Sequence, residues 1–461
     1  MSGPVVMKFG GTSVEDAAAF ERVAAIVAAR VEMRPVVVVS AMARFTDALV
    51  AAVRQAAHGE PAEAAATLDE HLQRHVAVLR ALVPAPERRE LGDGLEEARR
   101  TLADLLRIIA AHPGTRLPLH DEVVSFGERL SSQLMASVLR ARGLRARWLD
   151  ARRCIRTDAQ HTRAEPLPDA TRAATRAEAG AALAEGETPV LGGFIGSAED
   201  GATTTLGRGG SDYSAALVGA ALDAAEIQIW TDVTGFLAAD PRVVPHARQI
   251  PRLSYAEAAE LAFFGAKVLH PRTIQPAVAQ GIPVRVCNSR QPEAPGTWIA
   301  ADTEPAARAV KAIAHKSGIT LVQVTAARML GAYGFLRAFF EVFERHRASV
   351  DVVATSEVSI SATLDDAAAL PALLPELEKL GTVGVEEGNA IVCVVGEGLA
   401  TSAGVAGEAF GAIRDVNVRM ISQGASRINL TFVVGEDRVR EVVKKLHAAF
   451  FELPPPAPGG D

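Results

Sequence analysis

One short run, residues 203–213 (T-T-T-L-G-R-G-G-S-D-Y), concentrates side chains that could bind a phosphate or a small charged substrate. Its core, residues 208–212, places a guanidinium, a hydroxyl and a carboxylate around two glycines. Glycines let backbone N–H groups approach a ligand closely, and a guanidinium binds carboxylates or phosphates through paired hydrogen bonds. An ordinary turn needs a glycine but not this whole set. The run therefore predicts half of a phosphoryl-transfer site, with an unrelated glycine turn as the alternative.

A second run, K-F-G-G-T-S at residues 8–13, lies near the amino end. Lys8 precedes Gly10 and Gly11, so it could reach a phosphate while backbone N–H groups approach the same ligand. The order differs from a Walker A loop, because the lysine comes before the glycines. No Gly-x-Gly-x-x-Gly follows a strand here either, which excludes a Rossmann fingerprint. The plain alternative is a lysine in an ordinary strand-turn.

Other polar residues follow or interrupt apolar stretches. Ser40 and Thr46 come after the apolar run 36–39, and Glu128 lies beside a glycine within a helical pattern. Open α/β sheets bind ligands at the carboxyl ends of their strands, which suits these hydroxyls. Helix capping is the alternative for Ser40. A surface glutamate is the alternative for Glu128, and the sequence alone favours it.

Further along the chain, Thr231 and Asp232 end the apolar run 227–230, and the turn D-P-R at 240–242 carries opposite charges. Lys267 is a cation in an otherwise apolar stretch, for which a snorkelling surface lysine is the alternative.

The elements that must position these residues alternate between strand and helix. Residues 4–9, 14–31 and 36–40 indicate strand, helix and strand within about 40 residues, the pattern of a βαβ unit and a parallel sheet. A long alanine-rich helical pattern covers 48–111 with a break near 84–86. Further helices are predicted at 123–142, 170–185 and 213–222, and further strands at 148–150, 189–194 and 226–231. The sequence thus predicts one large α/β domain over residues 1–300.

A composition shift at 301–308 introduces a different pattern. Residues 319–324, 335–346, 350–355 and 358–364 indicate β, α, β and β, and residues 390–395, 404–416, 418–422 and 429–434 repeat that order before a helix at 438–450. Two ferredoxin-like α+β units are predicted, at 301–384 and 385–453, with a strand at 308–316 as a candidate for sharing between them. Residues 454–461 are predicted to form a disordered tail.

The composition excludes several classes of protein. Hydrophobic residues make up 49% of the chain and charged residues 22%, as expected for a packed globular protein. The net charge of −7 argues against nucleic acid as a partner. Three scattered cysteines give no disulfide framework or metal site. Without a leader pattern or a run of about 18 apolar residues, we expect a cytoplasmic protein with no membrane partner.

Read in order, these motifs closely resemble those of aspartate kinases. The resemblance rests on K-F-G-G-T-S at 8–13, G-G-F-I-G at 192–196, the run 203–213, W-T-D-V at 230–233, D-P-R at 240–242 and F-G-A-K-V-L-H-P at 264–271. It covers nearly the whole chain, since the two carboxy-terminal repeats look like the tandem ACT domains of that family. Glutamate 5-kinase and uridylate kinase share the fold without this pairing of motifs. The implied fold is the amino-acid-kinase fold, a mostly parallel sheet between helices, followed by two ACT domains.

The resemblance implies transfer of the ATP γ-phosphate to the side-chain carboxylate of L-aspartate, the first step of lysine, threonine and methionine biosynthesis. By similarity, Lys8 contacts the moving phosphoryl group, Asp212 orients that lysine, Arg208 holds the substrate α-carboxylate and Glu128 holds its α-ammonium group. The remaining substrate-binding residues are Ser40, Thr46, Phe194, Gly209 and Ser211. The ATP-binding residues are Lys8, Gly10, Gly11, Thr231, Asp232, Leu237, Arg242 and Lys267. Mg²⁺ is expected on the nucleotide phosphates, with no dedicated protein site.

The first ACT unit resembles the effector site of lysine-sensitive, single-chain aspartate kinases. In that resemblance Asp351 attracts the effector's ε-ammonium group, and the other contacts come from Met329, Ala332, Phe335, Leu336, Thr355, Ser356, Glu357 and Val358. Ala332 replaces a usual serine, which removes one hydroxyl. We therefore expect feedback inhibition by L-lysine, and a homodimer or dimer of dimers formed through the ACT domains.

One departure and two alternatives accompany this hypothesis. Family members usually have a tyrosine at the position of Leu237, so an aromatic contact to the nucleotide is either lost or displaced to Phe236. One alternative is a catalytically inactive ACT-type amino-acid sensor. The other is a kinase of the same fold that acts on another amino acid. The sensor is disfavoured by the joint presence of residues that it would not need: Lys8, Arg208, Asp212 and Lys267.

Overall fold

The computed structural model describes residues 3–112, 116–265, 269–301, 309–331 and 333–452. The chain divides into two compact units, Met1–Phe236 with Val268–Ala301 and Leu237–Lys267 with Asp302–Asp461. The segment 237–267 thus groups with the carboxy-terminal unit. No helix among the described residues is both long enough and apolar enough to cross a membrane. Lys267, Ala332 and the predicted tail at 454–461 lie outside the described residues.

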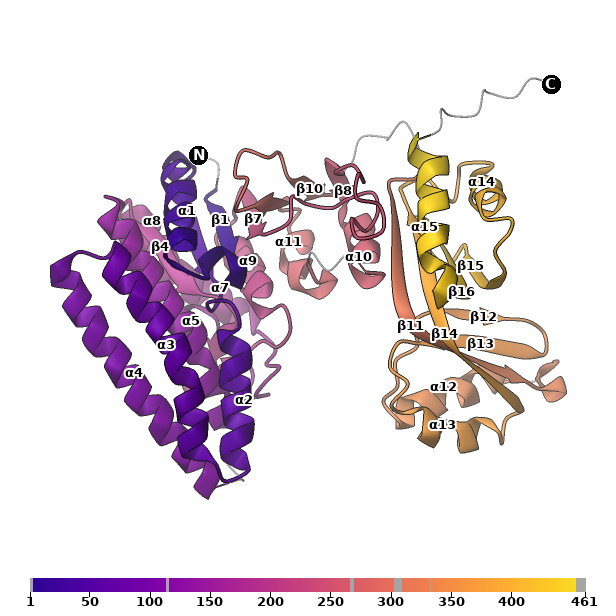
Figure 1. The fold of residues 1–461 in the computed structure, drawn as a ribbon, viewed down its shortest axis with the longest axis horizontal. Helices are drawn as coiled ribbons and strands as arrows, with labels where there is room; N and C mark the ends of the chain where they lie inside the picture. Colours follow the sequence, from indigo (N-terminus) through magenta and orange to yellow (C-terminus); the bar gives the residue numbers. More distant parts are fainter. Residues whose placement is uncertain (1–2, 113–115, 266–268, 302–308, 332, 453–461) are drawn as a thin grey trace. The chain divides into compact units, whose positions relative to one another are not determined.

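The first unit is built on a mostly parallel sheet, as the alternating pattern predicts. Within this unit its strands follow the order β3-β4-β2-β1-β7-β9-β10, in which β10 is antiparallel to β9 and the other neighbours are parallel. Figure 1 labels β1, β4, β7 and β10 of this sheet. The central strands are buried, which explains their near-continuous apolar sequences. The strands are β1 (Val5–Phe9), β2 (Pro35–Val39), β3 (Ala146–Leu149), β4 (Thr188–Gly192), β7 (Glu226–Thr231), β9 (Val284–Asn288) and β10 (Thr297–Ala300).

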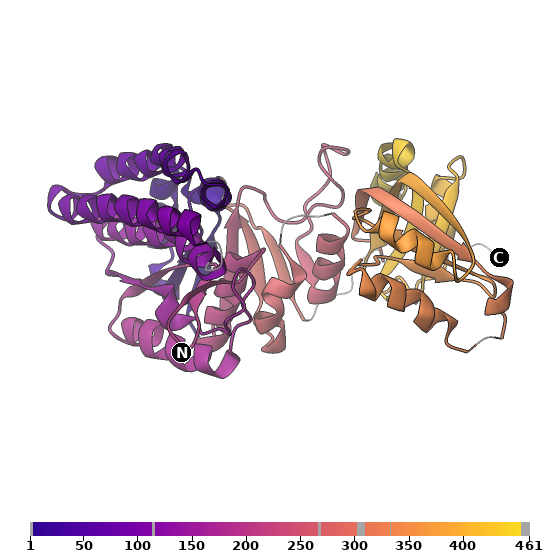
Figure 2. The ribbon, with the colours of Figure 1, turned by 90° about the horizontal axis from the view of Figure 1, so that it is seen from below.

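Long helices accompany this sheet. They are α1 (Ala17–Ala28), α2 (Phe45–Ala57), α3 (Pro61–Leu82), α4 (Ala85–Ala111) and α5 (Arg116–Ala141). Figure 2 shows the violet helices, α2 to α5, lying together. The predicted break near 84–86 is confirmed, and a second break precedes Pro61. Proline is accepted in the first turn of a helix but not in its interior, so both breaks occur at prolines. One apolar core joins α1 and α5 to the sheet, and a second joins α2, α3, α4 and α5.

The remaining elements of the first unit are short. A hairpin pairs β5 (Ile195–Ser197) with β6 (Thr203–Thr205), and the loop after β6 leads into α9 (Gly210–Ala221). The other helices are α6 (Ala151–Cys154), α7 (Pro168–Thr175), α8 (Ala181–Ala184) and α11 (Gln275–Ala279). The motif at 203–213 therefore runs from a strand, through a glycine loop, into the first turn of a helix.

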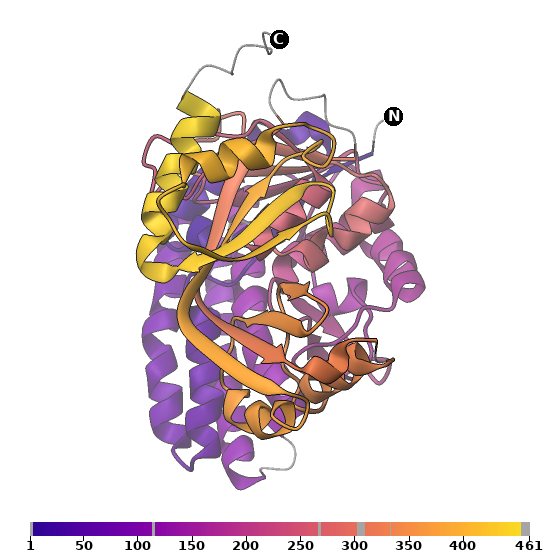
Figure 3. The same ribbon diagram turned by 90° about the vertical axis from the view of Figure 1, so that its right-hand side faces the viewer.

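The second unit contains one six-stranded antiparallel sheet in the order β12-β13-β11-β14-β16-β15. Figure 3 shows its two long central strands, β11 (Ala312–Thr325) and β14 (Thr382–Val395), in orange. The other strands are β12 (Val353–Thr355), β13 (Ser359–Leu364), β15 (Val418–Gln423) and β16 (Asn429–Gly435). The helices are α12 (Phe335–Arg345), α13 (Leu370–Leu377), α14 (Val405–Ala412) and α15 (Val439–His447), while β8 (Arg252–Ser254) and α10 (Tyr255–Phe263) come from the segment 237–267.

The long strands explain why the two predicted repeats share one sheet. Residues 312–317 pair with 390–395, and after an irregularity near Gly318 residues 321–325 pair with 382–386. Each long strand therefore contributes to two apolar cores. One core includes residues of α12 and α13, and the other includes residues of α14 and α15. For β11 the sequence predicts 308–316, as a candidate shared strand, and 319–324 as separate pieces. For β14 it predicts 390–395 and misses residues 382–389, because the repeat pattern marks one half of that strand. It also misses α13, whose Pro371 and Pro375 obscure the helical pattern.

The segment 237–267 is held to this sheet by buried polar contacts. Glu257 is fully buried and accepts a hydrogen bond from the Lys311 ammonium group at 2.8 Å. The backbone N–H of Ile313 also donates to the carbonyl of Ala238 at 2.8 Å. These contacts give a physical reason for the membership of the segment in the second unit.

Candidate active site

The candidate site lies where four neighbouring parallel strands end. β4, β2, β1 and β7 are adjacent in that order, and their registers align Gly192, Val39, Phe9 and Trp230. Predicted site residues follow each of these positions directly: Phe194 after β4, Ser40 after β2, Gly10 and Gly11 after β1, and Thr231 at the end of β7. Parallel strands place such residues at one edge of the sheet, which is where open α/β folds bind ligands.

A pocket of about 490 Å³ opens at this edge. All of the predicted aspartate-side residues line it, with Lys8 and Gly11 from the predicted ATP-binding set. The lining residues are Lys8, Gly11, Ser40, Ala41, Met42, Ala43, Arg44, Thr46, Asp47, Glu128, Phe194, Gly207, Arg208, Gly209, Gly210, Ser211 and Asp212. The structure therefore brings together residues that lie up to about 200 positions apart.

Lys8 and Asp212, which both line the pocket, form an ion pair. Lys8 Nζ lies 2.7 Å from Asp212 Oδ1, and each side chain is only about a tenth exposed. β1 supplies the lysine, and the first turn of α9 supplies the carboxylate. A partly buried pair of this kind has one defined geometry, because two flexible side chains restrain each other. Lys8 thus has a fixed position from which its ammonium group can meet a phosphate.

Glu128 is the residue for which the structure overrules the sequence preference. It lies on α5 and is only 3% exposed, so it is not a surface glutamate. Burial raises the pKa of its carboxyl group to about 8, against weaker lowering by a backbone hydrogen bond from Ala41 and by the charge of Lys8. Its Oε2 is buried without a hydrogen-bond partner among the described residues. Such an atom costs free energy unless a cation or donor binds it, so Glu128 is suited to an ammonium group.

Close backbone approaches hold Glu128 and α9 against the sheet. A Cβ added at Gly192 would lie 2.9 Å from the Glu128 Cβ, and one added at Gly193 would lie 2.7 Å from the Ser211 Cα. Neither distance is possible for a real side chain, so both positions require glycine. The next residue, Phe194, has φ +66°, a conformation that is unfavourable for an aromatic residue. Strain of this kind is kept where the surrounding structure fixes it, often at functional sites.

Arg208 and the start of α9 present positive charge to the pocket. Arg208 is exposed, and no ion pair to it is found among the residues that the structure describes. α9 begins at Gly210, after Gly209 with φ +72°. The first N–H groups of a helix lack intrahelical acceptors and attract anions. The sequence predicts this helix only from residue 213, so the helix start within the R-G-G-S-D run is not predicted.

The predicted phosphate donors Gly10 and Gly11 differ in the structure. The Gly10 N–H donates to the Trp230 carbonyl at 3.0 Å, so the prediction that it serves the nucleotide is not supported by this arrangement. The ladder between β1 and β7 extends one residue further than expected and uses that group. Gly11 lines the pocket, and a Cβ there would lie 3.0 Å from the Ala41 carbonyl oxygen. Gly11 therefore remains the better candidate donor.

Two charged pocket residues were absent from the sequence analysis. Arg44 and Asp47 line the pocket in the loop and first turn after β2, and Arg44 has φ +67°. Arg44 lies between the predicted site residues Ser40 and Thr46, and Asp47 directly follows Thr46, which is the signal that could have identified them. Their charges make this wall of the pocket polar.

The predicted ATP-side residues fall in both units. Thr231 and Asp232 lie at the end of β7 in the first unit, where the Thr231 hydroxyl donates to Asp232 Oδ1 at 3.1 Å. Leu237 and Arg242 belong to the second unit, and Arg242 is 83% exposed beside Asp240. Phe236 is 1% exposed and donates its N–H to Thr297 Oγ1 at 2.9 Å. Phe236 is therefore a core residue, and the idea that it replaces the missing aromatic contact is wrong.

Comparison with known proteins places this site in a family. Residues 3–288 match the amino acid kinase family, and residues 392–450 match an ACT domain family. The chain is 43% identical to the lysine-sensitive aspartokinase 3 of Escherichia coli K12 over 98% of its own length and 100% of that protein. The chain belongs to the aspartokinases. It is therefore an ATP-dependent kinase whose acceptor is the carboxylate of aspartate.

Solved structures agree over nearly the whole chain. The E. coli aspartokinase III structure in complex with aspartate and ADP, described as the R-state, matches with a TM-score of 0.83 at 41% identity, covering 97% of this chain and 100% of that one. The structure of the same enzyme with lysine and aspartate, described as the T-state, gives 0.81 at 40% identity and covers 97% and 99%. The predicted kinase fold with carboxy-terminal ACT domains is thus confirmed.

The predicted effector residues lie in the second unit, around a second buried carboxylate. The Asp351 side chain is 3% exposed, and its Oδ1 lies 3.5 Å from Lys316 Nζ. Burial raises the pKa of Asp351, while the Lys316 charge acts against this. Lys316 also lies 2.7 Å from Asp365 Oδ2. Asp351 Oδ2 is buried without a hydrogen-bond partner among the described residues.

Residues 355–358 form the exposed turn between β12 and β13. The N–H of Ala326 donates to the Val358 carbonyl at 2.8 Å, which joins this turn to the short helix that contains Met329. Met329 and Phe335 pack against the apolar core of the first ACT half, so any polar contact from them comes from the backbone. Leu336 is exposed, in the first turn of α12.

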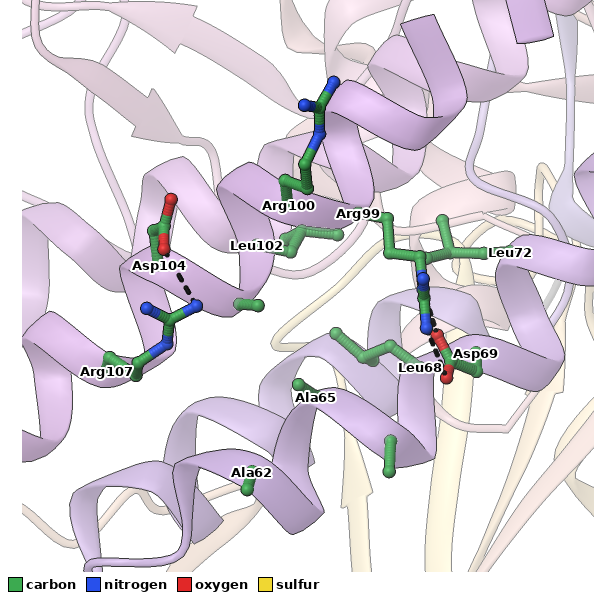
Figure 4. A pocket seen from close by; sticks show the side chains of 12 residues that line it. Ala62, Ala65, Leu68, Asp69, Leu72, Arg99, Arg100, Leu102, Asp104 and Arg107 are labelled. Carbon is green, nitrogen blue, oxygen red and sulfur yellow. Dashed lines mark hydrogen bonds and ion pairs between the residues drawn. The ribbon is translucent and has the colours of Figure 1, made fainter. Parts of the chain in front are cut away.

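Another cavity, of about 500 Å³, lies between α3 and α4 and contains none of the predicted site residues. Figure 4 shows two of its arginines in ion pairs: Arg99 with Asp69 across the helices at 2.8 Å, and Arg107 with Asp104 at 3.0 Å. Its floor is formed by leucine and alanine side chains. Because no predicted site residue lines it and two of its arginines are paired across or along the helices, this cavity is not the candidate aspartate site.

Metal-type ligands converge at one place in the described part of the second unit. His246, His447 and Glu452 offer ligand atoms within 4.8 Å of one another. Both imidazoles already contact Glu452 Oε1, at 3.0 Å and 2.8 Å, so hydrogen bonds account for the cluster. The pocket at the sheet edge contains no comparable group among the residues described.

Proposed function

We propose that this aspartokinase binds L-aspartate in the sheet-edge pocket through Glu128 and Arg208 and transfers the phosphoryl group beside Lys8. The observation that carries the proposal is the buried Glu128 carboxylate with an open oxygen, next to a lysine that Asp212 already holds. Arg208 would bind the α-carboxylate through two hydrogen bonds, and Glu128 would bind the α-ammonium group. Ser40, Thr46, Phe194, Gly209 and Ser211 complete the proposed substrate contacts.

The proposed chemistry follows from the charges in the pocket. An oxygen of the aspartate side-chain carboxylate attacks the γ-phosphorus of ATP, and the bond from that phosphorus to the bridging oxygen of ADP breaks. The nucleophile is already ionised, so no general base is needed. Lys8 and the start of α9 offset the negative charge on the phosphoryl oxygens, and positioning supplies the rest of the catalysis. Asp212 acts by keeping the Lys8 ammonium group in place.

The main carboxylates of the pocket already have other partners in this proposal, which fits a Mg²⁺ ion that arrives with the nucleotide. Asp212 is paired with Lys8, and Glu128 is buried beside the proposed ammonium site. Few protein oxygens are then left for a metal, which suits an ion held mainly by phosphates and water. Mg²⁺ would supply neutralisation of the phosphate charge when bound. On the nucleotide side we propose Lys8, Gly11, Thr231, Asp232, Leu237, Arg242 and Lys267.

A substrate-analogue experiment tests the two amino-acid contacts separately. The enzyme is assayed by trapping aspartyl phosphate as its hydroxamate, with L-aspartate, its α-amide and its N-acetyl derivative as substrates. The α-amide lacks the group proposed for Arg208, and the N-acetyl compound lacks the group proposed for Glu128. In Arg208→Lys the discrimination between aspartate and its α-amide should shrink, while discrimination against the N-acetyl compound stays. Unchanged discrimination in this variant would contradict the assignment of Arg208.

We also propose that L-lysine binds the first ACT half and inhibits the enzyme. The support is the lysine complex of the E. coli relative together with the open, buried Asp351 oxygen in this chain. The ε-ammonium group of lysine would bind Asp351, and backbone groups near Met329, Phe335, Leu336 and the turn 355–358 would bind its α-groups. Inhibition follows only if lysine binds one arrangement of the ACT pair better than the other.

Two measurements test the regulatory proposal. Activity is titrated with lysine and with threonine, and inhibition by threonine alone would contradict it. The oligomeric state is measured by light scattering with and without lysine, for which we propose a homodimer or a dimer of dimers. A monomer under both conditions would contradict assembly through the ACT domains.

A further inference from the structure

A buried aspartate outside the pocket gathers an unusual number of hydrogen bonds. Asp121 lies on α5 and is fully buried. Its Oδ1 accepts a hydrogen bond from the Thr205 hydroxyl at 2.8 Å and lies 3.2 Å from His120 Nδ1. Its Oδ2 accepts from the backbone N–H groups of Thr162 at 2.8 Å and Thr205 at 3.1 Å, and lies 3.2 Å from His161 Nδ1. Both carboxylate oxygens are therefore fully used.

These bonds hold the two segments from which the Arg208 loop emerges. Thr205 is the last residue of β6, three positions before Arg208. Thr162 has φ +72°, a conformation that needs outside support, and its carbonyl oxygen would lie 3.4 Å from a Cβ added at Gly207. The N–H of Ala164 also donates to the Thr205 carbonyl at 2.8 Å. The carboxylate thus fixes one end of the loop and the chain segment against which the loop packs.

Asp121 and Glu128 lie on the same helix, seven residues apart. Seven residues are about two turns, or about 10 Å along the axis, and bring both side chains to one face of α5. One rigid helix therefore carries the carboxylate proposed for the α-ammonium group and the carboxylate that anchors the Arg208 loop. The distance between the two contacts to the amino-acid end of the substrate is set by this helix.

We propose that Asp121 is a positioning residue for aspartate binding, which acts by fixing the β6 end so that Arg208 meets the α-carboxylate. The inference rests on the proposed role of Arg208. The competing interpretation is a buried carboxylate that only stabilises the fold. A positioning role predicts a selective change in the KM for aspartate, because an arginine displaced by about 1 Å loses much of its contact with the ligand.

The test compares Asp121→Asn with a matched neighbour, Glu122→Gln. Glu122 is bonded to Thr203, at the other end of the same strand, and to Arg129 at 2.9 Å. Asp121→Asn should raise the KM for aspartate at least about tenfold, with the KM for ATP changed less than twofold. Glu122→Gln should lower the thermal unfolding midpoint without this selective KM change. Equal KM changes for both substrates in Asp121→Asn would overturn the inference.

A double-mutant cycle with Arg208→Lys separates the inference from the proposed function. If Asp121 acts through Arg208, Asp121→Asn should have little further effect on the aspartate KM in the Arg208→Lys background. Multiplying effects would overturn the inference while leaving the role of Arg208 intact. An unchanged aspartate KM in Arg208→Lys alone would overturn the proposed role of Arg208, and the inference with it. If Asp121→Asn fails to fold, Thr205→Val removes one bond to Asp121 and should still raise the aspartate KM about threefold; no change there would count against the inference.

Discussion

The two amino-acid sites proposed for this enzyme are built around the same uncommon feature in two different folds. Glu128 in the kinase unit and Asp351 in the ACT unit are both buried, with a pKa raised first by burial. Each also has one oxygen without a hydrogen-bond partner among the described residues. A buried carboxylate of this kind is costly unless a cation binds it, so both are suited to an ammonium group.

The difference between the sites lies in the lysine beside each carboxylate. Lys8 pairs with Asp212 at 2.7 Å rather than with Glu128. We expect this pair to hold the Lys8 ammonium group toward a phosphate, while Glu128 Oε2 is left without a hydrogen-bond partner among the described residues. Lys316 lies 3.5 Å from Asp351 and 2.7 Å from Asp365, so the regulatory carboxylate already has a cation next to it. Lys316 also lies 5.0 Å from the ring centre of Phe263, on the segment 237–267.

The lysine beside the buried carboxylate has different partners in the two proposed sites. In the proposed catalytic pocket Lys8 is paired with Asp212, and we propose that its charge serves the phosphoryl group. In the ACT half the neighbouring lysine belongs to the carboxylate itself, so an incoming ammonium group must share Asp351 with it. We expect the open Glu128 oxygen to favour binding of the substrate ammonium group. At Asp351 we expect the ammonium group of an effector to exchange reversibly with Lys316.

The largest expected effect comes from replacing Lys8, the lysine that we propose to be catalytic. Lys8→Met should lower kcat by about 1,000-fold or more, because the charge beside the moving phosphoryl group is lost. Hydroxamate trapping measures the activity, and calorimetry should show unchanged lysine binding to the ACT half. Substantial activity in this variant would remove the basis for treating Lys8 and Lys316 differently.

Glu128→Gln should raise the KM for aspartate about 100-fold, since a buried charge pair with the substrate is lost. The same variant should be more stable than the parent above pH 8. The pKa of Glu128 is about 8 when folded and 4.5 when unfolded, so the folded state binds the proton more tightly. The cost of the buried charge is absent below pH 4.5 and fully present above pH 8. Thermal unfolding at pH 4 and pH 9 measures it, and an equal stability difference at both pH values would refute this explanation.

The pH dependence of substrate binding follows from the same group. Below its pKa of about 8 the Glu128 carboxyl is protonated in the free enzyme, and the substrate ammonium group must displace that proton. The KM for aspartate should therefore rise by up to about tenfold for each pH unit below 8. In Glu128→Gln the profile should be flat over the same range. A steep profile in that variant would assign the titration to another group.

Asp351→Asn tests the regulatory side of the comparison. The lysine concentration for half-inhibition should rise at least about tenfold, because the charge partner of the ε-ammonium group is removed. kcat and the KM for aspartate should stay within twofold, since Asp351 lies in the other unit. Asp365→Asn is the matched control, because it leaves the Asp351 oxygens in place. Stronger loss of inhibition in the control would show that Asp365 is the ammonium partner.

The smallest expected effect concerns the nucleotide. Leu237→Tyr restores the aromatic residue usual at this position and should lower the KM for ATP about threefold, within the range of an aromatic contact. Leu237→Phe is the control for the ring without the hydroxyl group. Neither variant should change aspartate or lysine affinity. A changed lysine affinity would link the nucleotide side to the ACT site.

Much of the molecule could be predicted from local sequence. The strands around Lys8 and Ser40, the helix after Gly210 and the repeated α+β pattern all depend on periodicity and on glycine or proline within a few residues. The R-G-G-S-D and K-F-G-G-T-S runs identified the chemistry, because their residue types are specific to phosphate and carboxylate binding. These features follow from local propensity, which adjacent residues largely set.

Other features depend on contacts between distant residues. Burial of Glu128 on α5 depends on Gly192 from strand β4, and the use of the Gly10 N–H depends on pairing with Trp230. The pairing of Lys316 with Asp351 and the anchoring of the Arg208 loop by Asp121 are likewise formed between segments far apart in the chain. No local pattern encodes them, since burial, pKa and hydrogen-bond partners are properties of the packed structure. Local sequence thus indicates which groups are chemically suited to the reaction, whereas packing between distant segments sets which of them are buried, paired or left open for a ligand.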